Sequence, residues 1–249
     1  MPTTQKIELG SQEKRQEGYR QLYQQINPEW EDSLKLLCKL FKPLLRPKMV
    51  ILDAGCGRAN FVVEQFRKSI DKAVGIDVSP KETEGNVILD QIVYGQLENL
   101  PFANESFDVV LSQWVLEHLE SPAEVFCEIF RVLKKKGALV FITPYKFSYL
   151  LLPRLILPKR LLRALVGMFY GRGKPDVFAT HYRANTPRRI EKMLARVGFE
   201  KHELILNNDP TYLAFNKVTF CLARLIEKAA RFLPFHLNQA HIIGVFIKL

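Results

Sequence analysis

The stretch VILDAGCGRANF, residues Val50–Phe61, restricts the fold of this chain more than any other. Three apolar residues run into Asp53, and small residues that include Gly55 and Gly57 follow before a pattern that suits a helix. An apolar strand ending in a glycine-bearing turn and a helix start is typical of nucleotide-like ligand sites in open α/β sheets. Glycine lets the backbone approach a ligand closely because it carries no Cβ. The stretch therefore predicts a ligand loop at the end of the first strand.

Length and composition are those of a globular protein. The chain has 249 residues, of which 47% are hydrophobic and 25% charged, which suits one large domain or a core domain with insertions. Its four cysteines are widely spaced and show neither metal-ligand nor disulfide spacing, and no carboxylate/histidine cluster suggests a metal. The N-terminus lacks the apolar core of a signal peptide. We expect a cytoplasmic protein without a bound metal.

Positive charge is concentrated in the second half of the chain. Residues 1–143 carry 18 Lys or Arg and 20 Asp or Glu, whereas residues 144–235 carry 17 and 6. The net charge of +10 therefore arises downstream of the ligand loop. Such asymmetry indicates an anionic partner for that segment, either a membrane surface, a nucleic acid or an acidic substrate.

Short apolar runs alternate with helical patterns along the chain, which predicts a mostly parallel sheet with right-handed crossovers. The expected strands are 49–53, 73–77, 91–95, 107–112, 138–143, 199–206 and 241–249. The expected helices are 11–26, 29–42, 60–69, 121–133 and 185–197. Ser121 and Thr186 are placed to act as N-caps, and Lys134–Gly137 has the basic residues and glycine that end a helix.

Three segments lie outside this alternation. Residues 1–47 form either a helical cap over the ligand site or helices packed on the sheet edge, and residues 48–249 form the main domain. Two basic, apolar insertions interrupt that domain at about 144–180 and 207–236, the second containing a helix over 211–232. Too many charges interrupt them for a membrane span. They suit a lid over an apolar pocket, helices that lie on a membrane surface, or helices packed on the domain with solvated charges.

Asp77 narrows the choice of ligand. It ends the second strand twenty residues after Gly57, where an acid hydrogen-bonds the two hydroxyls of a ribose. A dinucleotide fingerprint also requires a glycine at the sixth position of the turn, and Asn60 stands there instead of glycine. The spacing therefore disfavours a pyrophosphate-containing cofactor.

Four ordered blocks resemble the class I S-adenosylmethionine-dependent methyltransferases. They are VILDAGCGRANF (50–61), VGIDVSP (74–80), GQLENLPFANESFDVVLSQWVLEHLESP (95–122) and EIFRVLKKKGALVFITP (128–144). Within that family the chain looks most like the branch of the ubiquinone and menaquinone C-methyltransferases. The resemblance implies a Rossmann-like, seven-stranded, mostly parallel sheet with helices on both faces, helical insertions that cap the substrate side, and S-adenosylmethionine as the cofactor.

The resemblance also assigns the site, position by position. It implies cofactor contacts from Asp53, Ala54, Gly55, Cys56, Gly57, Asp77, Val78, Gln96, Leu97, Ser112 and Gln113. We expect Trp114, Tyr145 and Tyr182 to line the acceptor. Two positions depart from the family pattern, because Gln96 replaces the usual Asp near the adenine amino group and Ala59 replaces a common third glycine.

Direct SN2 transfer from a sulfonium needs alignment more than acid–base help, because the leaving group is neutral. A general base matters only when the acceptor must lose a proton. His118 and His181 are the candidates for that role, and each is also of the type that fixes a loop by hydrogen bonding.

We expect the acceptor to be a small lipophilic molecule such as a quinone precursor, a lipid or a polyketide, collected by a protein that touches the inner membrane surface peripherally. A glycan or other polar metabolite is the alternative. RNA fits less well because no RNA-binding module is recognisable, so we expect no nucleic-acid partner. A non-catalytic cofactor-binding protein is a further alternative, which the presence of Asp53, Gly55, Gly57 and Asp77 disfavours.

Overall fold

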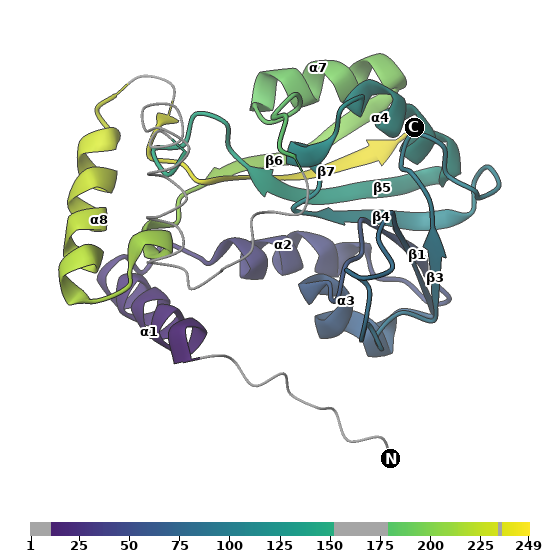
Figure 1. Ribbon diagram of the computed structural model, residues 1–249. Helices are drawn as coiled ribbons and strands as arrows, with labels where there is room; N and C mark the ends of the chain where they lie inside the picture. The colour runs from purple at the N-terminus through teal and green to yellow at the C-terminus, as the bar shows by residue number, and fades with distance from the viewer. Residues whose placement is uncertain (1–10, 152–178, 234–235) are drawn as a thin grey trace.

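The computed structural model describes residues 11–151, 179–233 and 236–249 (Figure 1). A seven-stranded sheet with the order β3-β2-β1-β4-β5-β7-β6 forms its centre. All neighbouring strands are parallel except that β7 runs antiparallel to both β5 and β6. The predicted α/β class with a mostly parallel seven-stranded sheet is confirmed. The strands are β1 (Val50–Ala54), β2 (Lys72–Asp77), β3 (Gln91–Tyr94), β4 (Phe107–Gln113), β5 (Leu133–Pro144), β6 (Phe199–Asn207) and β7 (His241–Lys248).

Helices cover both faces of the sheet, because its central strands are apolar on both sides. Along β1, Leu52 packs in the core under α4 and α7, and Ile51 packs in the opposite core against α2 and α3 (Figure 1). The α-helices are α1 (Ser11–Ile26), α2 (Ser33–Phe41), α3 (Phe61–Phe66), α4 (Pro122–Val132), α7 (Pro187–Val197) and α8 (Lys217–Ala230). Short 3₁₀ turns are η1 (Lys42–Leu44), η2 (Arg67–Ser69), η3 (Leu116–His118) and η4 (Pro210–Leu213).

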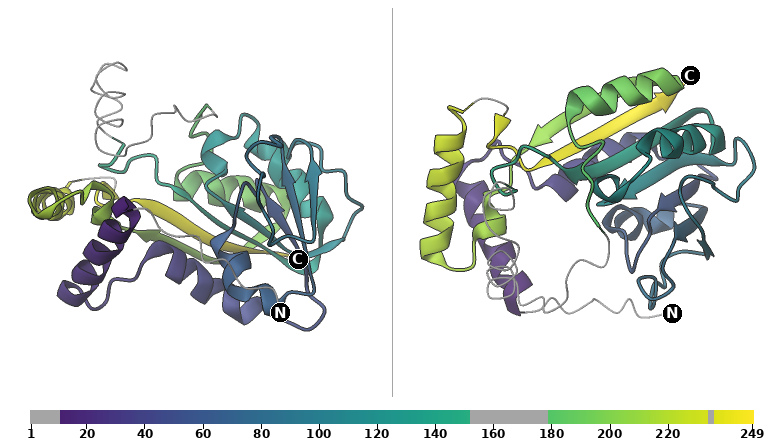
Figure 2. Two further views of the ribbon diagram at one scale, coloured as in Figure 1. Left: turned by 60° about the horizontal axis from the view of Figure 1, so that its bottom comes forward. Right: turned by 45° about the horizontal axis from the view of Figure 1, so that its top comes forward.

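Helices α1 and α8 pack together with η4 beyond one end of the sheet (Figure 2). The Tyr19 and Phe220 rings stack at 5.0 Å, and the Trp30 indole donates to the Asn208 carbonyl at 2.9 Å, just past the end of β6. Because Pro144 pairs with His241, the carboxyl end of β5 lies at the start of β7, on this side of the molecule. The α1–α8 bundle therefore flanks the edge of the sheet at which the parallel strands end.

The predicted helix end at Lys134–Gly137 is wrong, because these residues belong to β5. Helix α4 stops at Val132, and Leu133 is already extended. The Lys134 ammonium lies 3.1 Å from both oxygens of Asp108 at the start of β4, which draws the segment into the sheet. At Gly137 a Cβ would lie 3.0 Å from the Asp108 carbonyl oxygen. Glycine therefore permits a close approach between strands here.

Helix caps explain the other boundaries. Ser121 and Thr186 occupy N-cap positions, but neither side chain makes the capping hydrogen bond. The predicted helix over 211–232 is divided into η4 and α8, because Asn216 and Thr219 form a reciprocal capping box that starts a new helix.

Most of the insertion predicted at 144–180 falls on residues 152–178, which lie outside the described residues. Among the helices that the structure describes, none has the length and apolar character needed to span a membrane.

Candidate functional site

The glycine loop after β1 folds against the end of β2. The backbone N–H groups of Gly55 and Cys56 both donate to the Ile76 carbonyl, at 2.8 and 3.1 Å. Gly55 has φ +76°, and a Cβ there would lie 2.4 Å from Val115 Cγ2. Gly57 has φ +46°, and a Cβ there would meet no atom within 4 Å. The loop is therefore closed against Val115 and leaves open space above Gly57, as a ligand site requires.

Asp77 holds this loop from the end of β2. Its Oδ2 accepts the Gly57 N–H at 3.0 Å, and its Oδ1 accepts the Ser79 N–H at 2.9 Å. An ionised carboxylate has about four acceptor sites, so each oxygen retains capacity for one more donor. Val78 beside it is an exposed apolar residue (53%). This pair matches the needs of a ribose diol and a flat apolar base.

Asp53 is a buried carboxyl group with an unused oxygen. Its Oδ1 accepts from Asn60 Nδ2 at 2.7 Å, while Oδ2 is buried and has no hydrogen-bond partner among the described residues. Asn60 Oδ1 in turn accepts the N–H groups of Val62 and Val63 at the start of α3. Burial, aided by the charge of Asp77, raises the pKa of Asp53 to about 7. A cation bound at Oδ2 would favour the ionised form.

Cys56 packs in this loop as a neutral thiol. Burial, followed by the charges of Asp53 and Asp77, raises the pKa of Cys56 to about 12. Its Sγ lies where a Cβ on Gly75 would come within 2.7 Å, so glycine at 75 makes room for the thiol. Ala54, the last residue of β1, is fully buried beneath the loop. Both predicted loop residues are therefore buried at the base of the loop, and the Cys56 N–H is held by the Ile76 carbonyl.

The remaining predicted cofactor residues lie at the ends of β3 and β4. Gln96 is exposed just after β3, and Leu97 is buried beside it. Ser112 is buried in β4, and Gln113 Oε1 accepts the Phe61 N–H at 3.2 Å, which ties β4 to α3. Gln113 Nε2 is buried without a partner among the described residues. These residues and the loop occupy one edge of the sheet.

The predicted substrate residue Trp114 follows β4 with φ +59° and donates its N–H to the Ile142 carbonyl at 3.0 Å. Its ring packs edge-on against His241, with centroids 4.8 Å apart, and Tyr212 packs on the same imidazole at 5.4 Å. His241 Nδ1 lies 2.8 Å from the Ser33 hydroxyl. Burial, aided by Arg20, lowers the pKa of His241 to about 3. Sequence reasoning missed His241, although a histidine opening the apolar run HIIGVFIKL was a visible signal.

A second polar network, also not predicted, joins the ends of β4 and β5 to residues beyond 179. The Thr143 hydroxyl donates to Glu117 Oε2 at 3.0 Å, and Asn185 Nδ2 donates to Thr143 Oγ1 at 2.6 Å and to the Pro144 carbonyl at 3.1 Å. All three side chains are buried. The Glu117 carbonyl accepts the N–H groups of His181 and Tyr182 at 2.7 and 3.1 Å.

This network places the other predicted residues. His118 Nδ1 lies 2.8 Å from the Ala179 carbonyl, and His181 Nε2 lies 3.4 Å from Glu120 Oε1. Tyr145 is buried just after β5, and burial raises the pKa of its hydroxyl. Tyr182 is held with φ +51°. The structure thus brings His118, His181 and Tyr182 together around Glu117, and Tyr145 follows the neighbouring strand.

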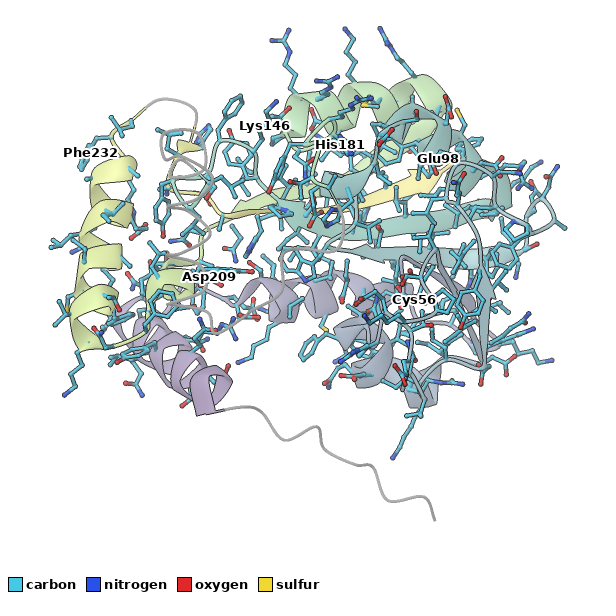
Figure 3. All side chains as sticks on the ribbon, viewed as in Figure 1. Cys56, Glu98, Lys146, His181, Asp209 and Phe232 are labelled. Carbon is cyan, nitrogen blue, oxygen red and sulfur yellow. The ribbon has the colours of Figure 1, made fainter. Side chains whose placement is uncertain are left out.

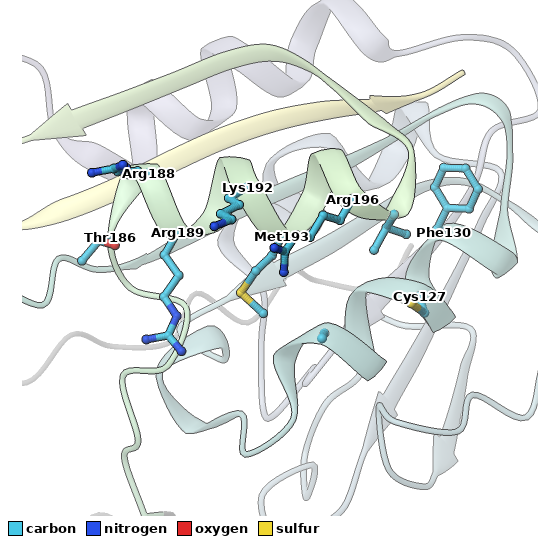
Figure 4. A pocket seen from close by; sticks show the side chains of 10 residues that line it. Cys127, Phe130, Thr186, Arg188, Arg189, Lys192, Met193 and Arg196 are labelled. Atoms are coloured by element: carbon cyan, nitrogen blue, oxygen red, sulfur yellow. The ribbon is translucent and has the colours of Figure 1, made fainter.

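A groove of about 900 Å³ lies away from this edge, between α4 and α7 (Figure 4). Phe130, Met193 and Val197 contribute apolar side chains to its wall. Its cations are Arg188, Arg189, Lys192 and Arg196, all exposed. None of the predicted site residues lines the groove.

Comparison with known proteins agrees with this geometry. Residues 52–141 match a family described as a methyltransferase domain. A demethylmenaquinone methyltransferase of Chlorobaculum parvum is 28% identical over 172 residues, which cover 61% of this chain and 66% of that protein. Residues 52–141 therefore have the sequence of a methyltransferase domain. The methyltransferase family expected from the sequence is confirmed over these residues, and the menaquinone-type protein is one of the relatives that the chain resembles.

Two further proteins resemble this chain. A tRNA U34 carboxymethyltransferase of Helicobacter pylori is 26% identical over 215 residues, covering 81% of this chain and 75% of that one. The solved S-adenosylmethionine-dependent methyltransferase of Mesorhizobium loti shares the fold with a TM-score of 0.55 at 17% identity, covering 84% and 96% of the two chains. The alignment spans about two thirds of the length of the menaquinone-type relative (66%).

The match of residues 52–141 to the methyltransferase domain implies S-adenosylmethionine as the methyl donor. The residues present fit that group. The unused, buried Asp53 Oδ2 suits an ammonium, the open space at Gly57 admits a ligand against the backbone, and Asp77 retains acceptor capacity for two hydroxyls. A cationic ligand would also meet two carboxylates at the same loop.

Proposed function

We propose that this protein transfers a methyl group from S-adenosylmethionine to a small lipophilic acceptor. The observation that carries the donor half of the proposal is the buried Asp53 oxygen that lacks a partner among the described residues, next to a loop held by Asp77. When bound, S-adenosylmethionine supplies an activated methyl group and a neutral leaving group. Asp77 would hold the ribose hydroxyls and Asp53 the amino group, with Val78, Gln96 and Leu97 around the adenine.

The acceptor would lie beyond β4 and β5. Trp114, Tyr145 and Tyr182 offer aromatic surface there, and aromatic walls with few polar groups are typical of sites for apolar small molecules. The menaquinone-type relative supports an acceptor of this class. Ser112 and Gln113 at the end of β4 would separate donor from acceptor and align the two.

Little acid–base chemistry is required of the protein. Positioning the two reactants supplies much of the acceleration in such transfers, up to roughly 7–11 kcal/mol in favourable systems. Where the acceptor is a phenol or an activated carbon, His118 or His181 would accept the proton, because His118 follows Glu117 in η3 and the His181 N–H bonds the Glu117 carbonyl.

Transfer of label from S-adenosylmethionine into a cell extract tests this function. The extract is incubated with the protein and with labelled methyl donor, then separated into lipid, nucleic-acid and polar fractions. We expect the label in the lipid fraction, and no label with the Asp77→Ala variant. Label in the polar fraction alone would replace the lipophilic acceptor by a glycan or other metabolite, and label in nucleic acid would favour an RNA substrate.

A further inference from the structure

Helix α8 is held rigidly on the α1–α8 bundle by one face. Phe220 and Ala223 are buried on that face together with Glu227. The Glu227 carboxylate accepts from Arg231 Nε at 2.7 Å, from Asn208 Nδ2 at 3.2 Å and from the Tyr23 hydroxyl at 3.4 Å. An ion pair between a buried carboxylate and a partly exposed guanidinium, with two neutral donors added, fixes the orientation of the helix. The opposite face must therefore point away from the molecule.

That outer face is apolar. Its large side chains are exposed to the extent of 77% at Val218, 65% at Leu225 and 91% at Phe232, with Leu222 and Leu233 also exposed. Val218, Leu222 and Leu225 recur at intervals of four and three residues, so they form one stripe on α8, and Phe232 and Leu233 follow just after the helix ends at Ala230. Figure 3 shows Phe232 beside the C-terminal end of α8, far from Cys56 in the cofactor loop. Single exposed apolar residues are ordinary, but a continuous apolar stripe indicates a surface that binds something.

Cations border this stripe along one side. Lys217, Arg224 and Lys228 fall at the same angle of the helix, between the apolar stripe and the buried face. The only acid of α8 is Glu227, which is buried on the inner face. Lys217 and Lys228 form no ion pair with any residue that the structure describes. The surface thus combines apolar area with unneutralised positive charge, which complements an anionic lipid headgroup layer better than it complements a second copy of itself.

The helix is also close to the acceptor side of the catalytic domain. Tyr212 of η4, which precedes α8 in the chain, packs on His241, and His241 packs on Trp114. Both views in Figure 2 place α8 beyond the end of the sheet. Helix α8 is therefore connected through η4 and His241 to the end of β4 that carries Trp114.

We propose that α8 docks in the plane of an anionic lipid surface, with its apolar stripe at the boundary between headgroups and acyl chains and its lysines at the phosphates. The role of this docking, which is to bring the enzyme to a lipophilic acceptor, rests on the proposed function. The binding of α8 to lipid does not. Of the two insertions expected to touch a membrane, this assigns the contact to the second, through Val218, Leu225 and Phe232.

Flotation of the full chain with vesicles tests the proposal. We expect binding to vesicles of phosphatidylcholine with phosphatidylglycerol, weak binding to phosphatidylcholine alone, and loss of binding at high salt. The Leu225→Ser/Phe232→Ser variant should bind at least about tenfold more weakly, because it exposes two fewer apolar groups to the lipid. Lys217→Gln/Lys228→Gln should weaken binding by about fivefold per charge. Arg188→Gln/Lys192→Gln on α7 removes the same charge elsewhere and should change binding by less than about twofold.

Three results would overturn the docking. The first is a wild-type chain that fails to float with anionic vesicles, and the second is an α7 variant that loses as much binding as the α8 variants. The third is a wild-type dimer by light scattering that becomes monomeric with Leu225→Ser/Phe232→Ser, which would make the stripe an interface between copies. Calorimetry with S-adenosylmethionine separates the two proposals, because all α8 variants should retain its affinity. If the wild type binds vesicles but not S-adenosylmethionine, the proposed function fails and the docking stands.

Discussion

The edge of the sheet at which the parallel strands end has a donor half, around the loop after β1, and an acceptor half, around the ends of β4 and β5. The two halves are held together by contacts of different range along the chain. In the donor half, Asp53 contacts Asn60 seven residues on, and Gly57 contacts Asp77 twenty residues on. In the acceptor half, Asn185 contacts Thr143 across 42 residues. The bond between Ser33 and His241 there spans 208 residues. Contacts between residues close in sequence produce a motif with a recognisable spacing. Contacts between residues this far apart produce none.

The two halves also differ in whether their buried polar groups have all their hydrogen-bond partners within the described residues. Asp53 keeps an oxygen without a partner among the described residues, and its raised pKa shows that the protein alone does not stabilise its charge. Thr143, by contrast, both donates to Glu117 and accepts from Asn185. We therefore expect donor-half substitutions to change ligand affinity and acceptor-half substitutions to change stability.

The largest effect should come from Asp77→Ala. The substitution removes the acceptor of the Gly57 and Ser79 N–H groups and the expected partner of the ribose. Hydrogen bonds to a charged group contribute about 1.5–3 kcal/mol each, so losing two at the ribose should weaken S-adenosylmethionine binding by at least about 100-fold in calorimetry.

Asp90→Ala is the matched control for Asp77→Ala. Asp90 also accepts a backbone N–H, from Ala73 at 2.7 Å, and it pairs with Arg67, but it precedes β3 at the opposite edge of the sheet. Its loss should lower the melting temperature and leave the affinity for S-adenosylmethionine unchanged. Equal loss of affinity in both variants would mean that Asp77 acts only through the stability of the loop.

Thr143→Val and Asn185→Ala should show the opposite behaviour. Each removes buried hydrogen bonds, which should cost about 2–3 kcal/mol of unfolding free energy in denaturant titrations. Because the two side chains share one bond, the double variant should lose about 1 kcal/mol less than the sum of the single variants. Thr143→Ser keeps the hydroxyl and serves as the control. A tenfold loss of cofactor affinity in any of them would contradict the division between the two halves.

The donor half and the sheet were predictable because their signals are local. The strand ends at Asp53 and Asp77, with the glycines between them, indicate the loop. The alternation of apolar runs with helical patterns indicates that the strands of the sheet are mostly parallel. Local signals also misled at Lys134, whose charge suited a helix end. The Asp108 carboxylate to which it bonds lies 26 residues away in the sequence, so nothing nearby indicated a strand there.

The acceptor half was only partly predictable for the same physical reason. Trp114, Tyr145 and Tyr182 were expected from resemblance to a family, and the structure places them near Glu117 and His241, which were not expected. Glu117 stands beside His118 in the sequence, but its burial depends on Thr143 and Asn185. Likewise, the packing of His241 between Trp114 and Tyr212 requires the antiparallel pairing of β7 with β5. Tertiary contacts decide such environments.

Asp53→Asn should make the donor half more stable and less able to bind. Between pH 4 and 7 the folded chain holds a proton on Asp53 that the unfolded chain has lost, so its unfolding free energy falls as pH rises through this window. Between pH 5 and 7.5 the wild type should therefore lose about 2 kcal/mol relative to Asp53→Asn. Asp71→Asn, at an exposed position before β2, should follow the wild type. Parallel pH profiles for all three proteins would show that Asp53 ionises normally.

The smallest effect should come from His241→Gln in the acceptor half, and it has the opposite sign. Because the pKa of His241 is lowered to about 3 in the folded chain, only the unfolded chain binds a proton at this imidazole as the pH falls below 6.5. The unfolding free energy therefore falls as pH falls. Between pH 7.0 and 5.5 the wild type should lose about 1 kcal/mol more than His241→Gln, since glutamine does not titrate. The contribution of Asp53 is common to both proteins and cancels. His202→Gln, at an exposed position in β6, should keep the wild-type slope. If His241→Gln keeps that slope as well, the imidazole binds protons equally in the folded and unfolded chains, and burial does not lower its pKa.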